Sequence, residues 1–360
     1  MKKHWRSALV VLLIVVLAVS GYYFLEHNSK RSVAVVEQTQ TTSAQKVQGE
    51  YGNQDKQITQ RLKTRIISGP KKGQHRTFYN TYFQSQATTN QYYRGTKLNL
   101  NNKGTEKLVI SGPKRDGVLY FSLVAIIIIL ILCMHLQALR PIVSATLNFV
   151  LFILMLFVTT ALQNQHIFLV ASITSVILTA LTLLIVFGIS RQTLVAFIAT
   201  LGSTFGAILL SVGVLLLTNF QGIHFETINY GIQPFQMVFL SETLLGVLGT
   251  VMDETTDITA SIYQLIIEKS NVTNKQMLHS GLTIGREIIG PLVNILFYIF
   301  LSALLPIIVI YLRNGNTMGF SLSRTMTLGY TQTVISAIGI VLAVPLTSFV
   351  ASHLLRGEHK

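Results

Sequence analysis

Residues 118–136 read VLYFSLVAIIIILILCMHL, a run that contains no Asp, Glu, Lys or Arg. An α-helix rises about 1.5 Å per residue, so the run covers about 28 Å, close to the hydrocarbon thickness of a bilayer, about 30 Å. Its apolar residues are continuous and do not alternate with polar ones, which disfavours a strand of an outer-membrane barrel. The run therefore predicts a transmembrane helix.

Seven other runs of the chain are also long and mostly apolar. The composition agrees with a membrane protein, because 50% of the 360 residues are hydrophobic and 12% are charged, whereas soluble domains carry about 25% charge. An ordinary soluble protein is excluded. The sequence predicts eight transmembrane helices, at Ala8–Leu25, Val118–Leu136, Ile142–Leu162, Ile167–Ile189, Leu194–Leu217, Phe235–Met252, Ile288–Leu312 and Leu328–Leu355.

The first of these runs has a second interpretation. Lys2, Lys3 and Arg6 precede an apolar run that contains AVS at residues 18–20, and this order also fits a cleaved signal peptide. The run continues to Leu25, beyond a cleavage site at that position, which favours an uncleaved helix. Both interpretations export the segment that follows.

Basic residues near the ends of the runs set the expected orientation, because Lys and Arg are retained on the cytoplasmic side. With the N-terminus inside, ten of them flank the helices in the cytoplasm and two lie in short outer loops. We therefore expect a multi-pass protein of the cell membrane with cytoplasmic N- and C-termini. The ten are Lys2, Lys3, Arg6, Arg140, Arg191, Lys269, Lys275, Arg286, Arg356 and Lys360, and the two are Arg313 and Arg324.

The segment between the first two helices is strongly basic, since Glu26–Asp116 contains 16 Lys and Arg against 6 Asp and Glu. Stretches rich in β-branched and aromatic residues predict strands at Gln57–Ser68, Arg76–Phe83 and Thr105–Ile110. Ser29–Glu50 is rich in Gln, Thr and Ser and predicts a flexible tether. The segment is thus expected to form a small, mainly β domain outside the cell.

The predicted fold class is an α-helical integral membrane bundle with a small β domain between helices 1 and 2. The expected organisation is an N-terminal transmembrane helix at 1–25, a tether and basic β-rich extracytoplasmic domain at 26–117, and a seven-helix membrane domain at 118–360.

Ionisable side chains inside apolar helices are costly and usually face a cavity or a partner. Glu242 lies seven residues into its run, and we expect the same helix to continue past Asp253 and Asp257 to about residue 269. At about 100° per residue these three carboxylates share one face. Arg286 and Asn294 likewise share a face of the next helix. We predict an ion or proton pathway formed by these five residues.

Each of these residues also has a purely structural interpretation. Asp253 and Asp257 lie near the expected cytoplasmic end of their helix, where acidic side chains can simply be solvated or paired with Arg286. The structural role of Asn294 would be an interhelical hydrogen bond that fixes packing and contributes about 1 kcal/mol. The sequence leaves these alternatives open.

Four short motifs resemble the YibE/F-like family of bacterial multispanning membrane proteins. The chain departs from the family's pattern at Thr250, where alanine is expected, and at the more acidic Glu254–Asp257. The resemblance implies an architecture and no particular reaction. The motifs are GTVMD at 249–253 with Ile258 and Ser261, GREIIG at 285–290 with Asn294, VLAVPL at 341–346, and ISGPKKG at 67–73.

Two functions follow from these features. The acids within the apolar runs and the helix breaks expected near Pro291 and Pro345 favour an ion- or proton-coupled permease of unknown substrate. The alternative is a non-transporting cell-envelope or assembly protein whose exported basic domain binds anionic polymer, lipid headgroups or a protein. Membrane lipid is a partner in both cases, and the exported position of the basic segment argues against nucleic acid.

An enzyme is not expected. The chain has no His-Glu-x-x-His motif, no Gly-x-Ser-x-Gly nucleophile turn and no phosphate-binding glycine loop. We therefore predict no catalytic residue, no resident metal and no cofactor. Cys133 is the single cysteine, so a disulfide within the chain is excluded.

Overall fold

A computed structural model describes most of the chain. The described residues are 15–16, 18–24, 32–48, 52, 54–86, 89–102, 108–163, 165–225, 234–269 and 272–355. The chain divides into two compact units, Met1–Leu139 and Arg140–Lys360. Residues 15–16 and 18–24 are helical. The rest of the predicted Ala8–Leu25 helix lies outside the described residues, as do the terminal basic residues used for the orientation.

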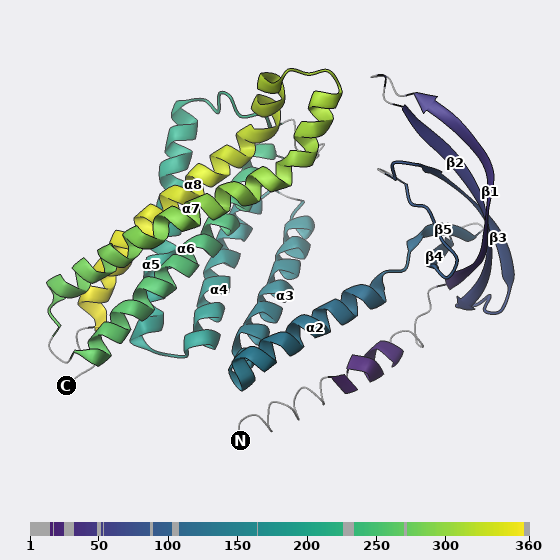
Figure 1. Cartoon of the computed structure of the whole chain (residues 1–360). Coiled ribbons are helices and arrows are strands. Elements are labelled where there is room, and N and C mark those ends of the chain that lie inside the picture. The colour runs from purple at the N-terminus through teal and green to yellow at the C-terminus, as the bar shows by residue number, and fades with distance from the viewer. Residues whose placement is uncertain are drawn as a thin grey trace. The chain divides into compact units, whose positions relative to one another are not determined.

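The first unit contains a five-stranded antiparallel sheet in the order β3-β2-β1-β4-β5. Figure 1 shows β1 and β2 as a long curved hairpin. A small β domain is therefore present, as the sequence predicts. The strands are β1 (Ser32–Gln48), β2 (Gln54–Ser68), β3 (His75–Phe83), β4 (Lys97–Asn102) and β5 (Leu108–Pro113).

Alternating side chains of β2 build the core of this sheet. Leu62, Thr64 and Ile66 are buried, while Lys63 and Arg65 between them are exposed, which is the period-2 pattern of a strand with one covered face. Leu62 packs with Val36 of β1. At the other end of β2, the Ser85 hydroxyl donates a 2.6 Å hydrogen bond to Asp55, and this bond lowers the pKa of the carboxyl.

The predicted tether at Ser29–Glu50 is wrong, because the described part of it forms β1. This strand is central in the sheet and pairs with both β2 and β4. Its first residues bury Val33 and Ala34, while its second half is exposed and pairs with β2 alone. Gln and Thr suit such a strand, because a backbone ladder and solvated side chains need no apolar composition.

The structure also corrects the other strands in detail. β4 is a strand that the sequence analysis did not predict. Of the predicted strand Thr105–Ile110, residues 108–110 lie in β5, and residues 103–107 lie outside the described part.

In the described part of the chain, seven helices are long and apolar enough to cross a membrane. They correspond to the seven predicted runs after the first. A short 3₁₀ helix, η1 (His135–Ala138), separates the first two of them. The seven are α2 (Asp116–Met134), α3 (Leu139–Ala161), α4 (Ile167–Phe187), α5 (Arg191–Leu217), α6 (Phe235–Glu268), α7 (Asn274–Arg313) and α8 (Met318–Leu354).

The last three helices are longer than the predicted runs, with 34, 40 and 37 residues. The continuation of α6 past Met252 was predicted. The early start of α7 has a local cause. The Thr273 side chain accepts a hydrogen bond from the Gln276 backbone, and the Gln276 side chain accepts one from the Thr273 backbone, a capping box that fixes the first turn.

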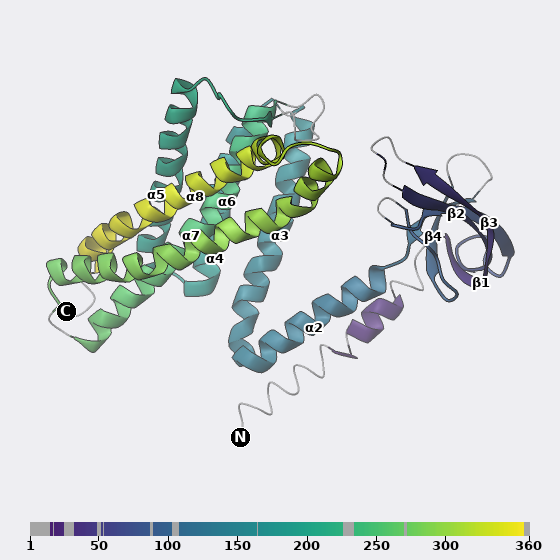
Figure 2. The same cartoon turned by 45° about the horizontal axis from the view of Figure 1, so that its top comes forward.

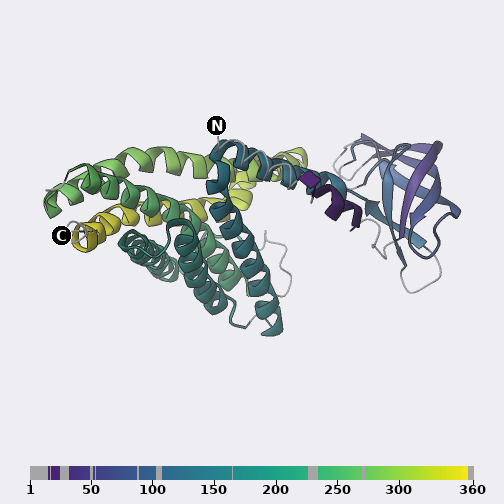
Figure 3. The same cartoon turned by 90° about the horizontal axis from the view of Figure 1, so that it is seen from below.

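Helix α8 packs against α5, α6 and α7 (Figures 1, 2 and 3). Glycines allow this close approach. A Cβ atom added to Gly339 of α8 would lie 2.8 Å from Val247 Cγ1 and 2.9 Å from Val251 Cγ2 of α6. One added to Gly281 of α7 would lie 2.9 Å from Ser348 Cβ of α8. Small residues at helix contacts are the usual basis of packing in membranes.

We predict that Gly339→Ala destabilises the helical unit, because its methyl group overlaps Val247 and Val251. Overpacking of this kind costs about 1–3 kcal/mol. The measurement is the thermal unfolding midpoint of the full-length protein in detergent, and Gly339→Ala should lower it. Gly319→Ala in the same helix is the control, because no described atom lies within 4 Å of its added Cβ. Equal midpoints for the two variants would contradict the packing described here.

Candidate functional site

The predicted acidic stripe lies on an exposed face of α6. Glu242, Asp253 and Asp257 are exposed side chains, and the glycines at 246 and 249 between them are exposed as well. They share one face, as a spacing of about 100° per residue requires. The second unit does not bury this face, and the pathway role of the three carboxylates stays a prediction.

A neighbouring helix approaches the stripe at one of its two glycines. The Nε2 atom of Gln332 in α8 lies 3.2 Å from the position of a Cβ on Gly246. At Gly249 no described atom lies within 4 Å of that position. Close contact is therefore limited to the half of the stripe that contains Glu242.

The two candidate residues on α7 are also exposed. Arg286 and Asn294 lie on its outer surface, whereas Gly285 is buried against Val344 of α8. Among the residues that the structure describes, no ion pair joins Arg286 to a carboxylate of α6. The alternative of an Asp–Arg pair is thus not observed, and solvation is the structural interpretation that fits the exposure of Asp253 and Asp257.

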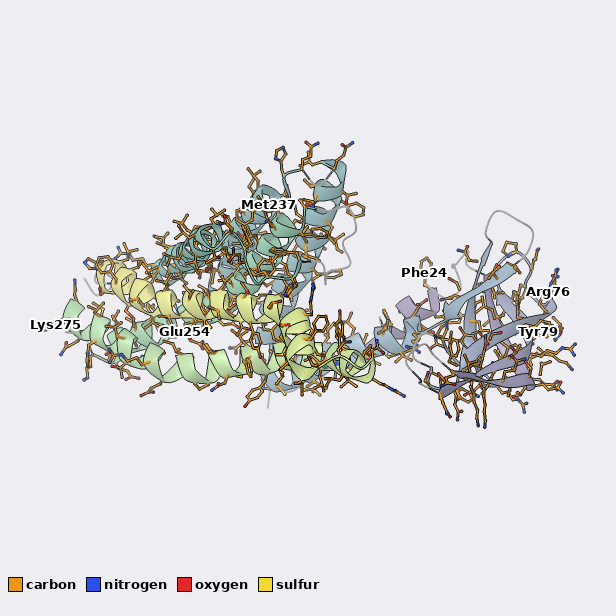
Figure 4. The ribbon with its side chains drawn as sticks, turned by 90° about the horizontal axis from the view of Figure 1, so that it is seen from above. Phe24, Arg76, Tyr79, Met237, Glu254 and Lys275 are labelled. Carbon is orange, nitrogen blue, oxygen red and sulfur yellow. The ribbon has the colours of Figure 1, made fainter. Side chains whose placement is uncertain are left out.

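The buried carboxyl group of α6 is Glu254, which the sequence-based stripe does not include. Its side chain is 0% exposed. In the described part of the chain, neither Oε1 nor Oε2 has a hydrogen-bond partner. Figure 4 marks Glu254 among the helices of the second unit. A buried carboxyl group with both oxygens unpaired is rare in proteins, because its desolvation is uncompensated.

Glu254 lies between two apolar layers of the bundle. Val247 and Val251 belong to one hydrophobic cluster, which includes Ala343 of α8. Ile258 and Ile262 belong to a second cluster, which includes residues of α5, α7 and α8. The carboxyl group therefore interrupts an otherwise apolar face of α6.

Buried hydroxyl groups occur at the same level. Thr255 and Thr200 of α5 are both fully buried, and their Oγ1 atoms lie 2.6 Å apart in a hydrogen bond. One turn further along α5, the buried hydroxyls of Ser203 and Thr204 have no hydrogen-bond partner among the described atoms. Near Glu254 the bundle thus contains several small buried polar groups, and among the described residues no salt bridge to Glu254 is present.

A signal for Glu254 was present in the sequence. It lies three residues after Val251, seven after Val247 and four before Ile258, so all four share one helical face. An acid in the middle of an apolar helical face is a stronger sign of a buried carboxyl group than an acid on a polar face, because the apolar face packs into the core. The sequence analysis grouped the carboxylates with one another and missed this position.

Two family models match the chain. The model of the YibE/F-like protein matches residues 122–357, which includes α3 to α8. The model of the YibE/F family N-terminal domain matches residues 23–113, which includes the five-stranded sheet.

No curated protein and no solved structure matches the chain. The family assignment therefore rests on the two family models, which between them cover both units. They agree with the seven apolar helices that follow a small antiparallel sheet. The chain is a multi-helix membrane protein that belongs to the YibE/F-like family.

Proposed function

We propose that this protein is an ion- or proton-coupled permease of the cell membrane in which Glu254 carries the coupling charge. The observation that supports the proposal is the complete burial of this carboxyl group without a hydrogen-bond partner in the described residues. Ionisable groups within membrane helices commonly mark proton or ion pathways.

The physical argument concerns the charge on this group. A buried carboxylate without a partner is strongly unfavourable, by at least several kcal/mol. A bound proton or a bound monovalent cation removes the net charge and most of this cost. The charged form of Glu254 therefore favours a packing of α6 against α8 that is open to water. The form with a bound proton or cation favours a closed packing. Coupling of this kind is what a permease requires.

The predicted pathway residues supply routes to Glu254. Asp253 and Asp257 lie close to Glu254 in the sequence but on the exposed face of α6. They attract cations from the side of the α6–α7 connection. Glu242 lies twelve residues earlier, about 18 Å along the helix axis, and provides a station towards the opposite end. Arg286 and Asn294 lie on the next helix, where Pro291 removes one backbone hydrogen bond and eases bending.

The orientation of the chain is part of the proposal. The Lys and Arg distribution favours cytoplasmic termini, so the β domain is extracytoplasmic and the α6–α7 connection is cytoplasmic. Asp253, Glu254 and Asp257 then lie near the cytoplasmic side.

We predict that a jump in proton or sodium concentration causes a transient charge displacement in proteoliposomes that contain the full-length protein. Solid-supported membrane electrophysiology measures this current and needs no knowledge of the transported substrate. Glu254→Gln should abolish the current, because the amide cannot bind a proton or a cation in place of the carboxylate.

Asp253→Asn is the matched control, since it removes a carboxylate from the adjacent, exposed position. We expect it to change the rate of the current and to leave a measurable displacement. A wild-type protein that gives no current with either ion, or a Glu254→Gln variant with an unchanged current, would refute coupling through Glu254.

The second candidate function is a non-transporting cell-envelope or assembly protein. One observation favours it: exposed side chains of β2 present Arg61, Lys63 and Arg65 at alternate positions. Under this alternative the basic β domain carries the function and the helices serve as an anchor. The absence of any charge displacement would favour it.

The orientation predicts a specific labelling pattern. In a Cys133→Ser background, which removes the exposed native thiol, Gln84→Cys should react with a membrane-impermeant maleimide in intact cells. Lys269→Cys should react only after permeabilisation. The reverse pattern would overturn the proposed orientation, and the two sites serve as controls for each other.

A further inference from the structure

The outward side of β2 carries a row of basic residues that is independent of the helical unit. Arg61, Lys63 and Arg65 are exposed and alternate with buried residues. Alternate residues of a strand lie about 6.8 Å apart. The row therefore presents cationic groups at regular intervals on one side of the sheet.

The members of this row differ in how their charge is balanced. Glu37 forms an ion pair with Arg65 at 3.1 Å, and its other carboxylate oxygen lies 3.2 Å from Nδ1 of His75. In the described part of the chain, Arg61 and Lys63 have no acidic partner within 4 Å. Arg65 is thus neutralised within the domain, while its two neighbours on β2 retain their charge.

A third cation joins Arg61 and Lys63. These two side chains and Arg94, from the connection between β3 and β4, line a groove of about 400 Å³ together with residues 37–40 of β1. Arg94 also has no acidic partner within 4 Å among the described residues. Three cations therefore line a groove in which Glu37 is the one carboxylate.

The connection that carries Arg94 is held in place on both sides. The buried Gln60 side chain donates a 3.0 Å hydrogen bond to the carbonyl oxygen of Tyr92, and Tyr92 is itself buried in the core. On the other side, the Gly95 backbone donates a 2.8 Å hydrogen bond to the carbonyl oxygen of Val36. The backbone at Arg94 is thus fixed before any ligand binds, which reduces the entropic cost of binding.

We propose that this groove binds a phosphate group of a linear, phosphate-bearing polymer. The guanidinium groups of two arginines match phosphate oxygens with paired N–H donors, and Lys63 adds a compact charge. Gln38, Thr39 and Gln40 supply amide and hydroxyl groups that suit the polar links between phosphates. This inference goes beyond transport and does not depend on the role of Glu254.

Several observations favour a polymer over other anionic partners. The groove is concave and small, whereas a bilayer surface requires a flat or protruding basic face. A stable protein partner buries about 800 Å² on each side, more than seven lining residues provide. Next to the groove, Tyr79 is paired across the strands with Arg61 and is 66% exposed; Figure 4 marks it on β3. An exposed ring beside the cations extends the surface along which a chain can lie.

The test measures binding of inorganic polyphosphate to the full-length protein in neutral detergent by fluorescence anisotropy at low salt. A triple variant, Arg61→Gln with Lys63→Gln and Arg94→Gln, should lose at least about tenfold in affinity, because it removes three charge-assisted contacts. The control triple variant, Lys56→Gln with Lys72→Gln and Arg76→Gln, removes the same charge from exposed positions outside the groove. It should lose less than about threefold, as expected for screened long-range attraction.

A further variant should raise the affinity for polyphosphate instead of lowering it. Glu37→Gln removes the one carboxylate that lines the groove and frees Arg65, so it should tighten polyphosphate binding severalfold. Circular dichroism should be unchanged for all variants, since none of the substituted side chains is buried in the core of the β domain.

Other outcomes would overturn the proposal. Equal losses in the two triple variants would mean diffuse attraction to the basic domain. Tighter binding of phosphatidylglycerol vesicles than of polyphosphate would assign the groove to a lipid surface. Equal binding of a carboxylate polymer, polygalacturonate, would remove the preference for phosphate.

Discussion

Close contact between α8 and its neighbours is the constraint on which the helical unit depends. In a membrane, helices are not driven together by the hydrophobic effect, so packing between small residues decides which faces meet. The absence of a side chain at Gly339 lets Val247 and Val251 of α6 pack closely against α8. Gly281 and Gly285 of α7 likewise allow side chains of α8 to pack closely. Glu254 lies on the same face of α6 between two hydrophobic clusters that include residues of α8, and it is fully buried.

Most hydrogen bonds of the buried hydroxyls do not connect helices. Thr259, Thr347 and Ser348 each donate to the carbonyl oxygen four residues earlier in their own helix, at 2.6–2.7 Å. The Thr200–Thr255 pair does join two helices. Polar groups satisfied within one helix do not oppose movement of that helix against another. The bundle can therefore contain many Ser and Thr residues and still change its packing at small cost in hydrogen bonds.

The sequence predicts the helices well because hydropathy and length suffice to identify them. The sequence predicts strands poorly where hydrogen bonding to neighbouring strands decides the structure. The polar stretch that forms β1 has the composition of a linker, and its two partner strands make it a strand. The position of Glu254 was readable on the apolar face of α6, yet its complete burial depends on contact with helices that lie elsewhere in the chain. Such a contact follows from the tertiary arrangement and not from local periodicity.

The lengths of α6 and α7 exceed what a bilayer can accommodate. At about 1.5 Å per residue they extend about 51 Å and 60 Å, and even a tilt of about 40° leaves α7 about 46 Å tall across a hydrocarbon core of about 30 Å. Near the start of α7, the exposed side chains of Lys275, Arg286 and Glu287 are suited to water. Helices of this length have more residues than a hydrocarbon core of that thickness needs, so the ends of α6 and α7 that meet at the α6–α7 connection can be reached from water.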